Sequence, residues 1–165
     1  MQKEASVQVT IIAVGKIKEK FLQEAIAEYE KRLRPYVKLH ILEIPEEKRP
    51  VSATVSVETR AMEKEGERIL AAIPDASVVV TLDAQGTNRS SEEFATTFRQ
   101  WELAGKSHIC FMIGGDLGFA PAVIARSDQR LSLSRMTFTH PIARFLLLEQ
   151  VYRAQRINHG EPYHK

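Results

Sequence analysis

Hydrophobic positions along this chain fall into two alternating patterns. Short apolar runs rich in β-branched residues are typical of strands buried in a sheet. Longer segments carry apolar residues three and four positions apart, which is typical of helices. Strands are therefore predicted at residues 7–14, 37–44, 77–82, 108–113 and 130–133, and helices at residues 21–33, 57–73, 90–104, near 121, and at 141–158. The segments 46–56 and 83–88 are predicted to be loops.

This alternation predicts the architecture. Strands separated by helices favour a single α/β domain over residues 1–165, with a mostly parallel sheet flanked by helices. Such sheets bind ligands beyond the carboxyl ends of their strands. The two most continuous apolar strands end at Leu82 and at Ile113. We therefore expect the loops 83–88 and 114–120 to form the walls of one pocket.

The second of these loops contains the pair Gly114-Gly115. It matches neither the dinucleotide-binding pattern nor the P-loop, since no G-K-[ST] follows. Two interpretations remain open. The glycines supply the positive φ of a tight turn, or their missing side chains let a ligand approach the backbone closely.

The last predicted helix is apolar around most of its circumference, whereas a surface helix has one apolar stripe. A chain of this length offers one core, so the second apolar side is expected to meet another copy in a C2 homodimer. Arg144 lies among these apolar residues and needs a partner. A carboxylate, an anionic ligand and an RNA phosphate all remain candidates.

Composition narrows the possible classes. The 165 residues carry a formal net charge of +2, and the one cysteine, Cys110, excludes an internal disulfide. No histidine pair has zinc-ligand spacing, so no metal site is expected. No run is long enough to span a bilayer and the start lacks a signal peptide, so a cytoplasmic location is expected. Residues 126–165 hold seven Lys/Arg and three Asp/Glu, which is compatible with RNA contact.

The chain ends in Tyr163, His164 and Lys165. By position alone such a segment is usually a frayed tail. An aromatic ring, an imidazole and a cation in succession are also groups that a functional site uses, so the tail over residues 159–165 is a candidate part of a site.

Several segments, in order and at matching spacing, resemble the small SPOUT-class RNA methyltransferases of the RlmH type. The resemblance covers essentially the whole chain, with Met1–Ser6 as a short extension. Thr139 stands where the family usually has proline. The matching segments are V-T-I-I-A-V-G-K, A-I-A-E-Y-E-K-R-L, E-K-E-G-E-R-I-L, V-V-T-L-D, I-G-G, S-L-S-R-M-T-F, H-P-I-A-R, L-L-E-Q-V-Y-R-A and Y-H-K.

The resemblance implies a Rossmann-like domain whose C-terminal part threads into a deep trefoil knot. It also implies that S-adenosylmethionine (SAM) is held in the knot and that the substrate is N3 of a pseudouridine in 23S ribosomal RNA (rRNA), within the assembled ribosome. Carried over residue by residue, the expected SAM-binding positions are Leu82, Gly114, Leu133, Ser134, Arg135, Met136, Thr137 and Phe138.

The same resemblance implies a composite site, in which the tail of one protomer reaches the SAM pocket of the other. N3–H of pseudouridine must lose its proton, so a base or a group that stabilises the anion is required. We expect His164 to be the base and Tyr163 to stack on or hydrogen-bond the target base. Arg153 is expected to hold phosphate or stabilise the anion. Arg144 and Lys165 are expected to contact RNA.

Two other functions are weighed against this one. A non-catalytic RNA-binding or ribosome-associated module that keeps the fold predicts no SAM binding. A small-molecule α/β enzyme that uses the glycine loop predicts turnover without RNA. The joint presence of I-G-G, L-S-R-M-T-F and Y-H-K favours the methyltransferase over both.

Overall fold

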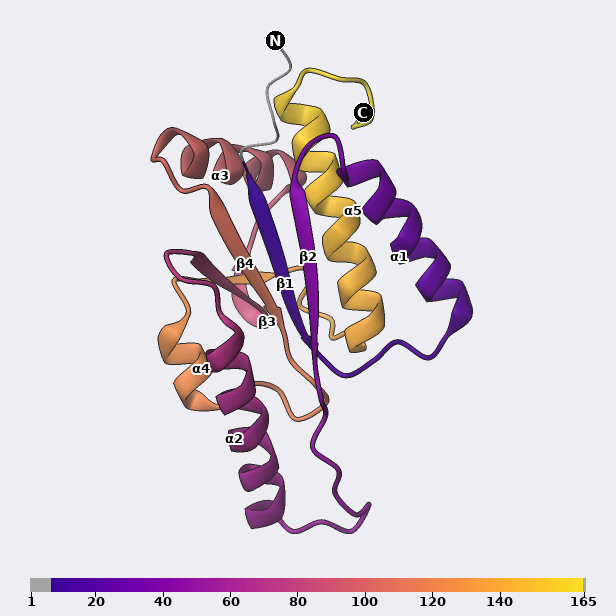
Figure 1. Ribbon diagram of the computed structural model, residues 1–165, viewed down its shortest axis with the longest axis vertical. Helices are drawn as coiled ribbons and strands as arrows, with labels where there is room; N and C mark the ends of the chain where they lie inside the picture. Colours follow the sequence, from indigo (N-terminus) through magenta and orange to yellow (C-terminus); the bar gives the residue numbers. More distant parts are fainter. Residues whose placement is uncertain (1–6, 165) are drawn as a thin grey trace.

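The computed structural model describes residues 7–164 and has a five-stranded parallel sheet between two layers of helices (Figure 1). The strand order is β2-β1-β4-β3-β5. The strands are β1 (Gln8–Val14), β2 (Lys38–Ile44), β3 (Val78–Asn88), β4 (His108–Ile113) and β5 (Gln129–Ser132). The helices are α1 (Lys20–Leu33), α2 (Val55–Ala72), α3 (Ser91–Leu103), α4 (Pro121–Arg126) and α5 (His140–Asn158). The predicted fold class is confirmed.

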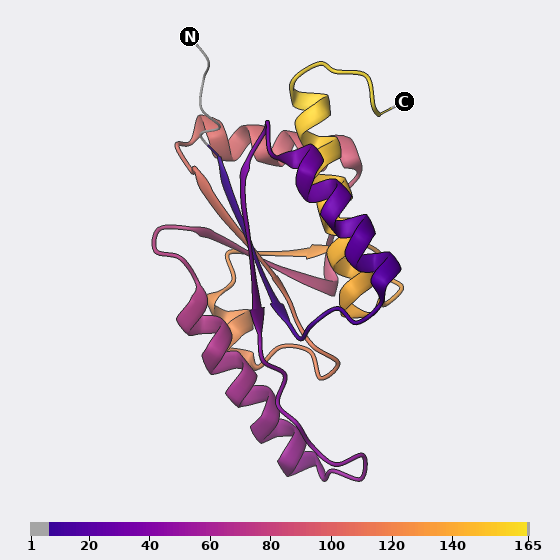
Figure 2. The same cartoon turned by 45° about the vertical axis from the view of Figure 1, so that its right-hand side comes forward.

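The two faces of the sheet bury two separate cores. Strand side chains alternate between faces, so in β1 Val9 and Ile11 face one core while Ile12 and Val14 face the other. The first core is completed by α1, α3 and α5, and the second by α2 and α4. Figure 2 shows α1 in front of α5 on one side of the sheet and α2 on the other.

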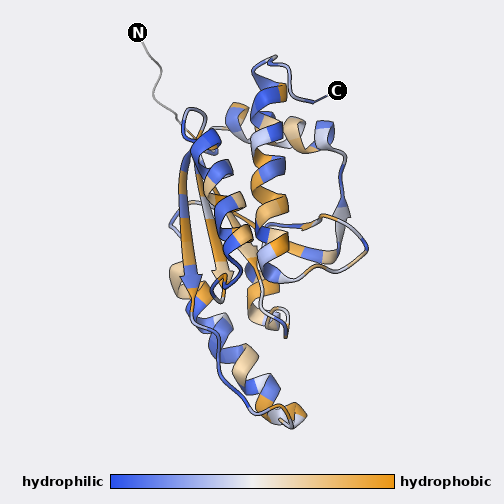
Figure 3. Cartoon of the chain, turned by 90° about the vertical axis from the view of Figure 1, so that its right-hand side faces the viewer, coloured by the Kyte–Doolittle hydropathy of each residue, from blue (hydrophilic) through white to orange (hydrophobic). Residues whose placement is uncertain are grey.

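Helix α5 lies between α1 and α3, and its neighbours account for its apolar circumference (Figure 3). Leu147, Leu148 and Val151 are fully buried. The rings of Phe145 and Tyr152 pack edge-on against Tyr29 of α1. As predicted, α5 is covered on two sides. Both sides are covered by elements of the same chain, so a second copy is not needed to bury them.

The entrance of α5 is regular despite Thr139. Thr139 has extended backbone angles, its carbonyl accepts a hydrogen bond from Ala143 N–H at 2.9 Å, and Pro141 occupies the first turn. A proline there needs no N–H partner. Replacement of the usual proline by threonine thus leaves the start of the helix intact.

The prediction of a loop at residues 83–88 is wrong, because β3 continues to Asn88. Its register with β5 shifts between Leu82 and Thr87, so the strand bulges there. Gly86 permits this approach of the two strands, since a Cβ atom would lie 2.6 Å from the carbonyl oxygen of Arg130. Beyond the bulge, Thr87 and Asn88 pair with Leu131 and Ser132 of β5.

None of the helices within residues 7–164 combines the length and apolar character needed to cross a bilayer. The predicted extension Met1–Ser6 lies outside the described residues.

Candidate active site

A cavity of about 460 Å³ opens beyond the carboxyl ends of β3 and β4, where the sequence predicted a pocket. Its walls come from the β3 bulge, the glycine loop, the segment before α5 and the first turn of α5. Seven of the eight predicted SAM-binding residues line it: Leu82, Gly114, Leu133, Ser134, Met136, Thr137 and Phe138. Arg135 is exposed and does not line the cavity.

Both interpretations of the glycine loop find support, at different glycines. The positive φ of the turn belongs to Gly118, at +80°. Gly114 and Gly115 have no positive φ and line the cavity, as Gly118 also does. A Cβ atom at Gly115 would lie 3.2 Å from Val14 Cγ1, so this position is packed tightly against β1. The paired glycines thus bring bare backbone to the cavity wall.

The segment before α5 is held to the β3 bulge by Ser132. Its hydroxyl lies 3.1 Å from the carbonyl oxygen of Ala84 and 2.9 Å from that of Ser134. The side chain of Ser134 in turn accepts a hydrogen bond from Met136 N–H at 3.0 Å. These bonds fix the wall formed by residues 133–138 relative to β3.

Two groups at the cavity were not predicted from the sequence. Asp83 and Arg130 form an ion pair at the rim, and the Arg130 guanidinium lowers the pKa of Asp83. His140 lines the cavity, and burial followed by the charge of Arg144 lowers its pKa to about 4. Its position before Pro141 indicated only a packing or capping group.

The expected RNA contact of Arg144 is corrected by the structure. The Arg144 side chain is 5% exposed, and its Nη1 donates to Glu43 Oε2 at 3.0 Å. Its Nη2 lies 2.7 Å from His140 Nε2. Arginine only donates, so Nε2 accepts and the neutral imidazole carries its proton on Nδ1. Of the three candidate partners of Arg144, the structure shows a carboxylate, that of Glu43.

The tail predicted to carry catalysis is ordered against α1, α3 and α5. Tyr163 donates to Glu149 Oε1 at 3.0 Å, and the Arg153 guanidinium lies 4.7 Å from the centre of the Tyr163 ring. Arg153 also forms an ion pair with Glu149. The structure thus gathers Tyr163, Arg153 and His164 at one place. Lys165 lies outside the described residues.

Both ring nitrogens of His164 have partners. Arg153 Nη1 donates to Nδ1 at 3.1 Å, because a guanidinium has no acceptor. Nε2 lies 2.7 Å from Glu92 Oε1 and therefore carries the proton that this carboxylate accepts. The hydrogen bond from His164 contributes to lowering the pKa of Glu92, after the backbone hydrogen bond of Glu92 itself.

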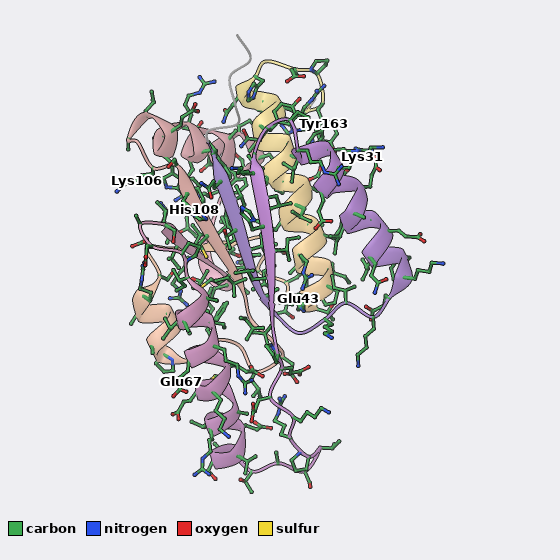
Figure 4. The ribbon with its side chains drawn as sticks, in the orientation of Figure 1. Lys31, Glu43, Glu67, Lys106, His108 and Tyr163 are labelled. Atoms are coloured by element: carbon green, nitrogen blue, oxygen red, sulfur yellow. The ribbon has the colours of Figure 1, made fainter. Side chains whose placement is uncertain are left out.

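The tail and the cavity lie at opposite ends of α5. His140 lines the cavity in the first turn and Arg153 contacts the tail, so the 13 residues between them span about 20 Å of helix. Figure 4 shows the same separation, with Glu43 at one end of α5 and Tyr163 at the other. The predicted site residues of this chain therefore form two groups, and its own tail does not enter its own cavity.

Across residues 7–164, no three His, Cys, Asp or Glu side chains gather in a way that could hold a metal ion.

Comparison with known proteins places this geometry in a family. The family model described as "Predicted SPOUT methyltransferase" matches residues 7–164. A protein of Methanoregula boonei is 63% identical over 158 residues, which are 96% of this chain and 99% of the relative. Proteins of Carboxydothermus hydrogenoformans and Clostridium acetobutylicum, each named "Ribosomal RNA large subunit methyltransferase H", are 49% and 51% identical. They cover 96% and 95% of this chain, and 99% of each relative is covered.

Solved structures support the fold independently. A probable methyltransferase from Bordetella pertussis superposes with a TM-score of 0.56 at 11% identity, covering 92% of this chain and 98% of that one. A probable methylase family protein from Haemophilus influenzae superposes with a TM-score of 0.53 at 14% identity, covering 97% and 71%. At such identities the likeness concerns the fold alone.

Proposed function

The chain belongs to the SPOUT methyltransferase family, and on that premise we propose that it transfers a methyl group from SAM to large-subunit rRNA. The acceptor is N3 of a pseudouridine in 23S rRNA on the assembled ribosome, which places the protein in the cytoplasm. One observation carries the proposal: residues from three separate segments, 82–84, 113–119 and 133–138, close around one cavity at the carboxyl ends of the strands.

The cavity suits SAM in size and chemistry. Its volume of about 460 Å³ lies within the range of small-molecule sites. Ile113, Phe119 and Leu133 supply apolar walls, and the side-chain-free Gly114 and Gly115 expose backbone groups to the edge of an adenine ring. When bound there, SAM supplies the methyl group from its sulfonium. His140 lines the cavity and burial lowers its pKa to about 4, so at neutral pH it would add no positive charge to a cavity that holds this cation.

The path of the chain near the cavity accords with the trefoil knot of the family. After β5 at the edge of the sheet, residues 133–139 turn along the cavity, and α5 returns between α1 and α3 toward the other end of the molecule. We infer that this return is the threaded segment. The cavity is then built on the knot itself.

The working site is composite, with the cavity from one protomer and the tail from its partner in a homodimer. Two observations support this arrangement. The tail lies about 20 Å along α5 from its own cavity. Three apolar side chains near the cavity mouth are unusually exposed, Met136 at 76%, Phe138 at 42% and Ile142 at 39%. A second copy packed over these residues would bury them and bring its own tail to the cavity.

In this arrangement each tail residue has a separate role in the reaction. His164 is the base candidate, but its Nδ1 lone pair is already occupied by Arg153. For His164 to accept the N3 proton through Nδ1, Arg153 must turn from the imidazole toward the substrate, where its charge stabilises the developing imide anion. The Tyr163 hydroxyl is engaged by Glu149, so its ring is the part that contacts the target base. Arg135, exposed beside the cavity, and Lys165 are the proposed contacts to RNA phosphate.

The decisive experiment incubates the purified protein and labelled SAM with ribosomes that lack the modification, alongside free rRNA. The product nucleoside is identified by mass spectrometry. N3-methylpseudouridine on ribosomes is the expected result. SAM binding without transfer would move the substrate elsewhere, and absence of both would favour the non-catalytic, ribosome-associated module.

A further inference from the structure

Two tyrosines on one side of α1 contact the C-terminal tail, although no residue of α1 lines the cavity within the described chain. Tyr29 lies in the helix and Tyr36 follows its last turn, seven positions later. Both rings pack edge-on against Tyr152 of α5, with centroids 5.8 and 6.1 Å away.

Tyr36 fixes the base of the tail. Its hydroxyl donates to Glu161 Oε1 at 2.8 Å and accepts from Arg156 Nη1 at 3.0 Å. Arg156 also donates to Glu161 Oε2 at 2.6 Å and to the carbonyl oxygen of Pro162 at 3.0 Å. The chain leaving α5 is thus held at two successive residues before it reaches the functional tip.

Tyr29 fixes the tip. Its hydroxyl oxygen lies 3.0 Å from that of Tyr163. The one proton of Tyr163 is donated to Glu149 Oε1, so the hydrogen bond between the two tyrosines must be donated by Tyr29. The order of donation therefore runs from Tyr29 to Tyr163 to Glu149. Burial and the hydrogen bonds to Tyr29 and Glu149 raise the pKa of Tyr163, which keeps this proton in place.

We propose that Tyr29 and Tyr36 form a hydroxyl clamp that holds the tail in its working position, which makes α1 a positioning element for the active site of the partner protomer. This inference rests on the proposed function, in which Tyr163 and His164 act in the partner's cavity. Ordering a free segment costs conformational entropy for each residue that is fixed. A tail already ordered in the free protein avoids that cost when substrate binds.

Loss of the clamp is expected to reduce the rate of methyl transfer and not the affinity for SAM. Tyr29→Phe and Tyr36→Phe each remove one hydroxyl and keep the ring, so the packing of α1 on α5 is retained. Tyr29→Phe loses one hydrogen bond to a neutral hydroxyl and is expected to slow methyl transfer about three- to tenfold. Tyr36→Phe loses hydrogen bonds to the charged Glu161 and Arg156, so it is expected to slow transfer about tenfold or more. Affinity for SAM is expected to stay unchanged, since the cavity is remote. Tyr152→Phe is the matched control, because within residues 7–164 the Tyr152 hydroxyl has no hydrogen-bond partner.

Mixed dimers test whether the clamp acts through the tail. Gly114→Leu fills the cavity and leaves the tail intact, while deletion of residues 163–165 leaves the cavity intact. A dimer with one protomer of each kind retains one working site, built from the cavity of the second and the tail of the first. Tyr29→Phe is then placed in one protomer or the other, and single-turnover transfer to unmodified ribosomes is measured at saturating SAM.

The expected result is a three- to tenfold loss when Tyr29→Phe lies in the protomer that donates the tail, and no change when it lies in the protomer that donates the cavity. An equal loss in both placements, or a loss only in the cavity donor, would show an effect on folding or on the cavity and would overturn the clamp. Thermal unfolding of each variant shows whether an equal loss in both placements is caused by reduced stability. If the wild-type protein transfers no methyl group, the proposed function itself fails. If the wild type is active but the mixed dimer is not, the composite site fails and the clamp with it, while the methyltransferase activity stands.

Discussion

The guanidinium of Arg144 lies 3.0 Å from Glu43 Oε2, although 101 positions separate the two residues. The pair joins the start of α5 to the end of β2, directly behind His140. It is strongly asymmetric, since the side chain of Arg144 is 5% exposed and that of Glu43 is 37% exposed.

This asymmetry predicts which partner matters more for stability. Glu43→Gln leaves a buried guanidinium with neutral partners only, and we expect it to lower the free energy of unfolding by about 1–3 kcal/mol. Arg144→Met leaves a carboxylate that water can reach, so we expect a cost below about 1 kcal/mol. Urea unfolding of the two variants at neutral pH tests the order. A larger loss for Arg144→Met would contradict this account of the pair.

His140 predicts a pH dependence of stability. Its folded pKa of about 4 lies below the ordinary value of 6.5, so between these pH values the unfolded chain binds more protons. Stability is therefore unaffected by His140 above pH 6.5 and falls as the pH drops toward 4. From pH 7 to pH 5 the expected loss from this group is up to about 2 kcal/mol. His140→Asn should flatten the profile measured by urea unfolding. Equal slopes for wild type and His140→Asn would refute the assignment.

Gly86 in the β3 bulge and Gly114 at the cavity are expected to respond differently to alanine. At Gly86 the new methyl group would lie 2.6 Å from the Arg130 carbonyl oxygen, and backbone must move. We expect Gly86→Ala to cost about 1–3 kcal/mol in the free energy of unfolding. At Gly114 the nearest atoms to a new Cβ lie at 3.4 Å, which is ordinary contact, so Gly114→Ala should cost under about 1 kcal/mol. Thermal or chemical unfolding decides the matter, and the reverse order would be incompatible with the close approach of β3 and β5.

The exposed apolar residues near the cavity mouth predict how the proposed homodimer can be disrupted. Ile142→Glu places a carboxylate in the proposed interface without altering a residue that lines the cavity. Burial of an unpaired charge costs several kcal/mol, so the protein should sediment as a monomer. Methyl transfer should fall at least about tenfold, while SAM binding persists. Leu103→Glu, at an 82% exposed site on α3, is the control and should stay dimeric. A monomeric Ile142→Glu variant with full activity would rule out the composite site.

The local pattern of apolar residues is enough to predict the elements with a continuous or regularly repeating buried side. The apolar runs of β1 and β4 and the helical repeat of α1 need no distant partner to be recognised. The extension of β3 through Gly86 was missed because it depends on pairing with β5, more than 40 positions away. A glycine inside a polar segment is a loop signal unless that pairing is known.

The site, like the fold, could be predicted only in part from the sequence. The strand ends predicted the location of the cavity, and seven of the residues that line it are positions that the resemblance implied for SAM. Neither predicted the neutral state of His140, because that depends on Arg144 and burial together. Tyr29 was not identified at all, since a tyrosine on the apolar side of an amphipathic helix is an ordinary core residue until the tail is seen to reach it.

The strand order has a consequence for how this protein is made. β1 lies inside the sheet between β2 and β4, and Gln8 pairs in register with His108, 100 positions later. At translation rates of about 5–20 residues per second, β1 waits roughly 5–20 s for β4 to emerge. During that interval one edge of a mostly apolar strand has no partner from β4. The nascent chain is therefore exposed to aggregation through this edge before the sheet that carries the cavity is complete.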